Sequence, residues 1–239
     1  MTTTPQQIIA LGGGGFSMEP ENLALDQYIL EQAGADVPNV CFLPTASGDS
    51  EGYVVNFFGA MAHLRCTPSM LGVWLRARPD FEAHLMAQDV IYVGGGNTMN
   101  MLAIWRAWGI DQILRRALEQ GVVLAGISAG AICWFEQGLT DSIPGRLSAL
   151  PCLGFLKDSC TPHYNGEAKR RPTYLEMVGQ QQMGPGVAID DSCGVHYIDG
   201  VRHRVVASKP DAHAYLVSRQ GDEAQEERLP AQLLDAVTV

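Results

Sequence analysis

Charge is scarce in this sequence, and positive charge is scarcer still. Only 18% of the 239 residues are charged, with 26 acidic against 16 basic side chains and a formal net charge of −10. A non-specific nucleic-acid binder needs a basic face, and anionic membranes attract basic segments. This balance therefore argues against nucleic-acid and membrane partners. The hydrophobic fraction of 46% excludes an intrinsically disordered chain.

Long hydrophobic runs and targeting signals are also missing. The longest weakly polar stretch, residues 121–135, is shorter than the ~20 residues that a membrane-spanning helix requires. Residues 1–7 carry no positive charge and no apolar core of signal-peptide length. We therefore expect a soluble, cytoplasmic protein.

Motifs for disulfides, metals and nucleotide cofactors are absent as well. The six cysteines form no C-x-x-C pair, and a chain of this length folds without covalent staples, so we expect reduced thiols. No H-E-x-x-H motif occurs and no two histidines stand four residues apart, so we expect no metal site. The glycine run 12–15 fails the dinucleotide fingerprint because Ser17 and Met18 stand where its last glycine is required. We expect no cofactor.

Short apolar runs alternate with longer amphipathic segments over the first two thirds of the chain. This alternation predicts βαβ units and a parallel sheet, with right-handed crossovers that place helices on both faces. The expected strands are 8–11, 40–43, 70–75, 90–93 and 122–125, and the expected helices are 20–33, 52–64, 81–86, 99–108, 111–120 and 131–135.

The pattern changes in the last third of the chain. Segments 195–198 and 201–206 flank an Asp-Gly pair that suits the two-residue turn of a β-hairpin, and 213–217 predicts a further strand. We expect these strands to extend the same sheet in antiparallel fashion. No low-complexity linker interrupts the sequence, so residues 1–239 are expected to form a single domain.

The sharpest motif is Gly126-Ile127-Ser128-Ala129-Gly130, which matches G-x-S-x-G between an expected buried strand and an expected helix. In that context a serine sits on a tight, strained turn with its hydroxyl above the sheet edge. We interpret Ser128 as a nucleophile; a plain glycine-rich turn is the alternative.

A serine nucleophile needs a base, and His163 is the candidate among six histidines. Pro162 keeps its segment extended, which places His163 at a strand end or in a loop, where catalytic residues gather. A solvated loop histidine is the alternative. Asp190 and Asp191 follow the apolar run 187–189, so one of them could orient the imidazole, or both could be turn residues.

Gly94-Gly95-Gly96 ends another expected strand. Backbone N–H groups there could form one wall of an oxyanion hole, with the Ala129 N–H as the other donor. A phosphate-binding loop or a simple turn is the alternative. Thr98 is the expected N-cap of the next helix.

A basic cluster, Lys169-Arg170-Arg171, follows His163 closely. In an acidic protein such a cluster could hold a substrate carboxylate through the planar fork of an arginine. A solvated basic turn is the alternative.

Three segments taken together, 94–98, 126–131 and 162–164, resemble the peptidase E family of serine peptidases, which includes the cyanophycinases. About 30 residues separate the glycine run from the serine, and 35 separate the serine from the histidine, which fits that family. The resemblance spans residues 8–217. It implies a three-layer α/β sandwich of the flavodoxin-like, class I glutamine-amidotransferase-like type, with a mostly parallel sheet and antiparallel C-terminal strands.

The resemblance also implies roles for individual residues. Ser128 would be the nucleophile, His163 the base, and Asp191, or next Asp190, the acid that orients the base. Relatives cleave dipeptides with an N-terminal aspartate, using an arginine downstream of the histidine. The remaining implied residues are the oxyanion-hole donors Gly96 and Ala129 and the substrate contacts Asn97, Arg171 and Arg170.

The resulting hypothesis is hydrolysis of small peptides by Ser-His-acid acyl-enzyme chemistry, in a monomer or homodimer, with segment 47–52 as a candidate lid. Two other interpretations stay open: a module that binds a small anion without chemistry, and a serine hydrolase with the α/β-hydrolase residue order. That order would draw its acid and its base from Asp141, Asp158, His196, His203 and His213.

Overall fold

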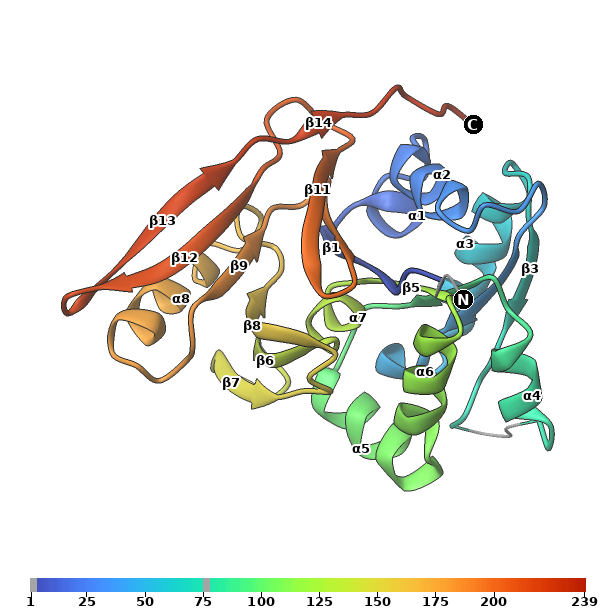
Figure 1. Ribbon diagram of the computed structural model, residues 1–239, viewed down its shortest axis with the longest axis horizontal. Coiled ribbons are helices and arrows are strands. Elements are labelled where there is room, and N and C mark those ends of the chain that lie inside the picture. The colour runs from blue at the N-terminus through green and yellow to red at the C-terminus, as the bar shows by residue number, and fades with distance from the viewer. Residues whose placement is uncertain (1–3, 75–77) are drawn as a thin grey trace.

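The computed structural model describes residues 4–74 and 78–239 and contains two mixed β-sheets with helices packed against them (Figure 1). The first sheet has eight strands in the order β14-β11-β10-β1-β5-β4-β2-β3. Strands β1, β5, β4, β2 and β3 are parallel, whereas β10 runs antiparallel to both β1 and β11. The bounds are β1 (Gln7–Gly13), β2 (Asn39–Leu43), β3 (Thr67–Met70), β4 (Val90–Val93), β5 (Val123–Ile127), β10 (Cys193–Ile198), β11 (Val201–Ala207) and β14 (Gln232–Leu233).

The second sheet has six strands in the order β13-β12-β9-β8-β6-β7 and extends to the left of the first in Figure 1. Strand β8 is parallel to β6 and β9, while β7 and the β12–β13 hairpin are added antiparallel. The bounds are β6 (Phe135–Thr140), β7 (Ser148–Pro151), β8 (Leu156–Thr161), β9 (Gly186–Ile189), β12 (Ala214–Gln220) and β13 (Glu223–Leu229).

Helices cover both faces of the first sheet. Alternate residues of β1 separate into two apolar clusters: Ile9 and Leu11 pack with α1, α2 and α3, whereas Ile8 and Ala10 pack with α5, α6 and α7. Strands buried on both faces read as continuous apolar runs, which is why they were recognisable in the sequence. The helix bounds are α1 (Gly15–Met18), α2 (Ala24–Glu31), η1 (Thr45–Ser47), α3 (Glu51–Met61), α4 (Phe81–Met86), α5 (Thr98–Trp108), α6 (Ile110–Glu119), α7 (Ala129–Ile132) and α8 (Arg170–Gly179).

The predicted hairpin is confirmed. Strands β10 and β11 pair antiparallel on either side of Asp199 and Gly200, whose φ angles of 52° and 76° are both positive. A two-residue type I′ turn requires positive φ at both positions, and Asp-Gly tolerates it well.

The expectation that every C-terminal strand extends one sheet is wrong. Strand β12 belongs to the second sheet, where Ala214 pairs with Ile189 of β9. The chain leaves β11 through a turn in which the Ala212 N–H donates to the Lys209 carbonyl at 3.2 Å. The redirected strand then lies beside β9 instead of β11.

The expected strand 70–75 is also wrong, since β3 ends at Met70 and residues 75–77 lie outside the described ranges. The N–H groups of Val73 and Trp74 donate to Asp49 Oδ2 at 2.7 and 2.8 Å. Because a side chain accepts both hydrogen bonds, this segment has no N–H groups left for a neighbouring strand at these positions.

The expected helix 131–135 is shorter than predicted. Helix α7 ends at Ile132, and β6 begins at Phe135. The Trp134 carbonyl accepts from the Leu156 N–H at 2.8 Å, so the backbone is already directed towards β8. Aromatic residues here favour the strand over a longer helix.

Candidate active site

Ser128 lies on a sharp turn between β5 and α7. Its φ of 56° and ψ of −112° are strained for a residue with a side chain, and it is partly buried. A Cβ on Gly126 would lie 2.2 Å from the Gly130 carbonyl oxygen, and a Cβ on Gly130 would lie 2.2 Å from that of Val93. The turn is therefore possible only with glycine at both positions, and it has the strand-turn-helix geometry of a nucleophile elbow.

Three consecutive carbonyl groups at the end of β1 anchor the candidate residues. The carbonyl oxygens of residues 11–13 accept, in that order, from the backbone N–H groups of Ser128 (3.1 Å), His163 (3.2 Å) and Ser192 (3.0 Å). Ser192 directly follows Asp191. Three segments that are distant in the sequence are thereby fixed to one stretch of strand.

His163 and Asp191 form a hydrogen-bonded pair. His163 Nδ1 lies 2.6 Å from Asp191 Oδ1, with the Nδ1–H donating to the carboxylate, and the side chains are 15% and 22% exposed. The Asp191 N–H donates to Asn165 Oδ1 at 2.8 Å, which fixes the turn that presents the carboxylate. This arrangement leaves His163 Nε2 as the nitrogen that can take a proton.

The glycine run 12–15 has a role that the sequence analysis missed. A Cβ on Gly13 would lie 2.0 Å from Asp191 Oδ1, and a Cβ on Gly166 would lie 2.0 Å from Asp191 Oδ2. Both glycines therefore make room for the carboxylate. Four consecutive glycines are a visible signal of close packing, but the sequence does not show that Asp191 is the residue packed there.

Asp190, the alternative acid, is engaged elsewhere. Its Oδ2 accepts from the His213 N–H at 3.0 Å, and its side chain is buried. Desolvation raises the pKa of this carboxyl group above its usual value. The acid in contact with His163 is thus Asp191.

The hydrogen bonds among the described residues do not include one between Ser128 Oγ and His163. Both backbones are nonetheless held by neighbouring carbonyl groups of β1. In ligand-free enzymes catalytic hydrogen bonds are often long and tighten when substrate binds.

The glycine loop 94–96 packs beside Ser128. A Cβ on Gly95 would lie 3.2 Å from Ser128 Cβ, so the loop approaches the serine closely. The Gly95 N–H donates to Tyr53 Oη at 3.2 Å, which fixes the loop from α3.

Two backbone N–H groups beside the serine, those of Gly96 and Ala129, have no acceptor among the described residues. Gly96 has a φ of 136°, and a Cβ there would lie 2.2 Å from the Ala46 carbonyl oxygen in η1. Only glycine fits this position.

Asn97 is the N-cap of α5. Its Oδ1 accepts from the Asn100 N–H at 3.0 Å, and its Nδ2 donates to the Ser142 carbonyl at 3.0 Å. The predicted cap, Thr98, is instead the first residue of the helix, because asparagine in the preceding position provides the better-placed acceptor. The amide of Asn97 is therefore committed within the protein.

Arg170 is buried, with only 3% of its side chain exposed. It donates to the Leu139 carbonyl at 2.8 Å and to Glu167 at 2.7 Å, and it lies 3.7 Å from Asp141. These contacts connect the start of α8 to β6. They occupy the guanidinium of Arg170, which was one of the expected substrate contacts.

Arg171, next along α8, is half exposed. It forms an ion pair with Glu226 of β13, and its guanidinium carbon lies 5.5 Å from the ring centroids of both Tyr164 and Tyr215. Tyr164 directly follows His163, so this arginine lies on an element that begins close to the candidate base.

The histidines of the α/β-hydrolase order occupy other positions. His196 is buried in β10, where its ring nitrogens lie 2.9 Å from Tyr28 Oη and 3.1 Å from Gln7 Oε1, and desolvation lowers its pKa to about 4. The hydrogen bonds and ion pairs of the described residues join neither Asp141 nor Asp158 to His196, His203 or His213.

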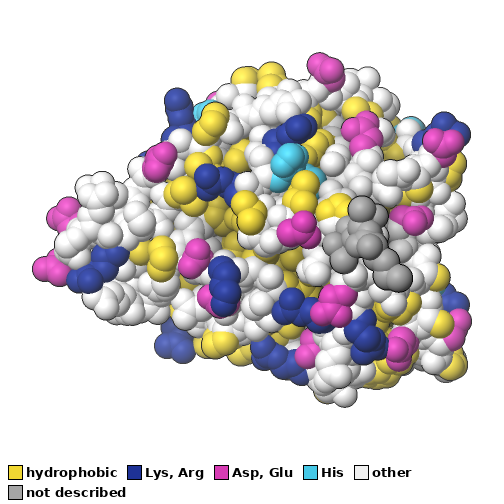
Figure 2. All heavy atoms as spheres, in the orientation of Figure 1, with side chains coloured by type: hydrophobic (Ala, Val, Ile, Leu, Met, Phe, Trp, Pro, Cys, Tyr) yellow, Lys and Arg dark blue, Asp and Glu magenta, His cyan; other side chains and the backbone are white. Residues whose placement is uncertain are grey.

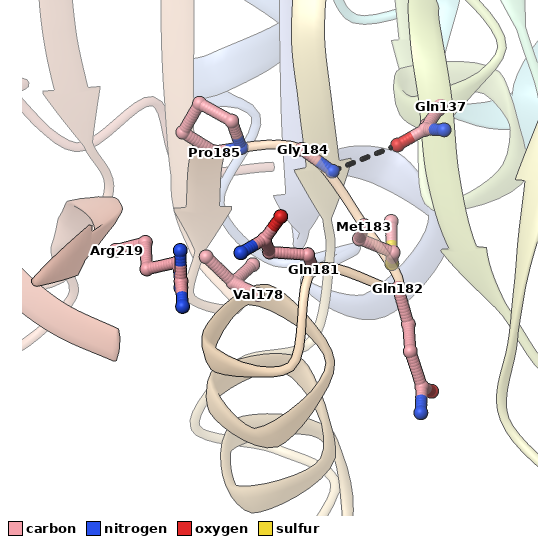
Figure 3. A pocket seen from close by; sticks show the side chains of 8 residues that line it. All are labelled: Gln137, Val178, Gln181, Gln182, Met183, Gly184, Pro185 and Arg219. Atoms are coloured by element: carbon pink, nitrogen blue, oxygen red, sulfur yellow. Dashed lines mark hydrogen bonds between the residues drawn. The ribbon is translucent and has the colours of Figure 1, made fainter. Parts of the chain in front are cut away.

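Other surface features lie away from these residues. A cavity of about 410 Å³ opens at the C-terminal end of α8 (Figure 3), where Gln137 Oε1 accepts from the Gly184 N–H at 2.9 Å. The face drawn in Figure 2 shows basic and acidic side chains interspersed.

Within residues 4–74 and 78–239, no three His, Cys, Asp or Glu side chains are grouped to bind a metal ion. In the same ranges, no helix combines the length and apolar character of a membrane span.

Comparisons with known proteins identify the family. The family model described as Peptidase family S51 matches residues 8–205. The uncharacterized peptidase YgaJ of Bacillus subtilis (strain 168) is 51% identical over 229 residues, covering 96% of this chain and 99% of that protein.

More distant relatives share the fold or part of the sequence. The crystal structure of a peptidase from an acI-B1 Actinobacterium has a TM-score of 0.73 at 18% identity, covering 99% of this chain and 98% of that one. A Drosophila melanogaster protein named probable alpha-aspartyl dipeptidase is 28% identical over 134 residues, or 54% of each chain. The chain belongs to peptidase family S51, the serine-type family of peptidase E and the cyanophycinases.

Proposed function

We propose that this S51 peptidase hydrolyses small peptides with Ser128, His163 and Asp191 as its catalytic residues. The observation that carries the proposal is the 2.6 Å His163–Asp191 hydrogen bond, anchored to the same strand end as the strained serine. Acyl transfer requires a serine, a base that takes its proton and an acid that orients the base, and these three residue types are held at one strand end here.

The proposed reaction begins when His163 Nε2 takes the proton of Ser128 Oγ, which attacks the scissile amide carbon. Asp191, bonded to Nδ1, stabilises the imidazolium that forms. The imidazolium then protonates the leaving amine as the amide C–N bond breaks. A water molecule, deprotonated by Nε2, attacks the resulting ester and releases the acid product and the serine hydroxyl.

The N–H groups of Gly96 and Ala129 are the proposed oxyanion-hole donors. Ala129 directly follows the serine, and Gly96 follows Gly95, which packs against it. Neither N–H group has an acceptor among the described residues, so no protein contact must break before they bind the developing negative charge. Removal of one such donor in a serine peptidase costs about 10²–10³ in turnover.

Dipeptides, those with an N-terminal aspartate among them, are the proposed substrates, and Arg171 is the proposed contact for the N-terminal side chain. The support is the exposed half of Arg171, since an arginine fork pairs with a carboxylate through two parallel hydrogen bonds. The name of the Drosophila relative points to the same class of dipeptide.

We also propose that residues 1–239 form one catalytic domain on a flavodoxin-like, class I glutamine-amidotransferase-like scaffold. One apolar cluster includes Ile8 of the first sheet together with Val187 and Ala214 of the second, so the two sheets share a core.

A dipeptide library tests the proposal, with Ser128→Ala protein as the matched blank. We expect the substitution to lower turnover by up to about 10⁶, and a serine-directed organophosphonate to label Ser128 in the unmodified protein only. Near-normal hydrolysis by Ser128→Ala protein, or no labelling of Ser128, would contradict it.

A further inference from the structure

Arg171 is held in a clamp formed by three other side chains: Glu226, Tyr164 and Tyr215. Both oxygens of Glu226 are used, because Oε1 accepts from Arg171 Nη2 while Oε2 accepts from the Tyr164 hydroxyl at 2.6 Å. The guanidinium lies 5.5 Å from each tyrosine ring centroid, within the range of cation–π attraction. We call these four residues the Arg171 clamp.

Strand geometry directs Glu226 into the clamp. Glu226 pairs with Val217 of β12, whose side chain belongs to the apolar cluster beneath α8, so Glu226 faces α8. Its side chain is 21% exposed. Successive strand residues point to opposite faces, so the neighbouring Glu227 points away from α8.

The Arg171 clamp lies next to the proposed catalytic residues. Tyr164 directly follows His163, and its N–H donates to the Ile189 carbonyl at 3.1 Å, two residues before Asp191. One member of the clamp is therefore covalently adjacent to the base and bonded to the strand that leads to the acid.

The charges within the clamp cancel. Arg171 contributes one positive charge, and Glu226 contributes one negative charge at hydrogen-bond contact. A substrate carboxylate brought to this arginine would meet the carboxylate of Glu226 as well, and like charges in contact repel. The substrate carboxylate would have to displace Glu226, which the Tyr164 hydroxyl already holds in place.

We infer that Glu226 determines specificity by occupying Arg171, so that the site accepts peptides with an uncharged N-terminal side chain at least as well as aspartyl peptides. This inference rests on the proposed function, because it places Arg171 beside the N-terminal side chain of the substrate. Glu226 acts as a built-in competitor for the acidic side chain. Its removal converts the site to aspartyl preference.

The test compares an isosteric pair of substrates, Asp-Leu and Asn-Leu. The variant is Glu226→Gln, which removes the charge and keeps an acceptor for Tyr164. Glu227→Gln is the matched control, because it makes the same change in net charge on the same strand and faces the other side. For the unmodified protein we expect a kcat/KM ratio of Asp-Leu to Asn-Leu at or below about one. In Glu226→Gln this ratio rises at least about tenfold, and in Glu227→Gln it stays unchanged.

Binding to Ser128→Ala protein separates this inference from the proposed function. Calorimetry in that background, with and without Glu226→Gln, measures the affinity for Asp-Leu without hydrolysis. Tighter binding with Glu226→Gln, but no Ser128-dependent hydrolysis in any protein, supports the role of Glu226 and refutes the peptidase mechanism. Hydrolysis with an unchanged substrate ratio and unchanged affinity overturns the role of Glu226 and leaves the mechanism standing. A ratio that rises equally in both glutamine variants overturns it too, because the effect would then come from net charge alone.

Discussion

Asp191→Asn is the most direct perturbation of the proposed mechanism. The carboxylate accepts the His163 Nδ1–H at 2.6 Å and is packed against Gly13 and Gly166, so asparagine fits the space with little change in volume. The substitution removes the negative charge that faces the imidazolium. It also allows the amide NH₂ to face Nδ1, which favours the wrong tautomer of the imidazole.

The expected loss follows from the electrostatics of a partly shielded pair. Two unit charges about 4 Å apart attract by about 4 kcal/mol at an effective dielectric constant of about 20, which corresponds to roughly 10³ in rate. Loss of the correct tautomer adds to this, and the equivalent change in a serine protease costs about 10⁴ in kcat. We expect kcat on a cleaved dipeptide to fall by about 10³–10⁴, with KM changed by less than about tenfold.

Asp190→Asn is the matched control for this prediction. Asp190 is the adjacent carboxyl group, but it bonds to the His213 N–H, and an asparagine oxygen can accept the same hydrogen bond. We expect this variant to retain kcat within about tenfold. Thermal melts of both variants confirm that each is folded. Equal losses in the two variants, or full activity in Asp191→Asn, would refute the reasoning.

Two further predictions concern stability. Asp26 is fully buried, and desolvation raises its pKa to about 7, so the folded protein keeps a proton that the unfolded chain releases near pH 4. The free energy of unfolding should therefore fall by up to about 4 kcal/mol as pH rises from about 4 to about 7. The variant Asp26→Asn retains an acceptor for the Phe16 N–H and should not show this fall in melting scans. If the difference in melting temperature between the unmodified protein and Asp26→Asn stays constant with pH, the raised pKa of Asp26 is contradicted. Gly59 lies within α3, and nothing approaches its Cβ position within 4 Å, so Gly59→Ala should stabilise the fold by about 0.5–1 kcal/mol; a lower melting temperature would show that the helix interior is not open there.

The sequence predicted the first sheet better than the second because the two sheets are covered differently. Segments 8–11 and 90–93 are apolar throughout, since helices bury both of their faces. Strand β13 reads Glu-Ala-Gln-Glu-Glu-Arg-Leu and is exposed over most of its length. An edge strand with one solvated face has no apolar run, so its pairing with β12 was not visible.

The candidate site, like the fold, could be predicted from the sequence only in part. Ser128 and His163 could be proposed because each belongs to a local motif, whereas the apolar run 187–189 pointed to Asp190 and Asp191 alike and only the family resemblance favoured Asp191. The sequence displayed the charge of Arg171, but not its partner, because Glu226 is 55 residues away on another strand. Local patterns reveal the type of a side chain, whereas the contact that neutralises it depends on tertiary pairing.

The anchoring of three segments to the end of β1 affects how accurately the site can be assembled. Residues 9–11 of this strand have no exposed surface and pair with β5 on one side and β10 on the other. The segments that carry the proposed nucleophile, base and acid are all hydrogen-bonded to the end of this one strand. A substitution that shifted the end of β1 would therefore displace all three proposed residues at once.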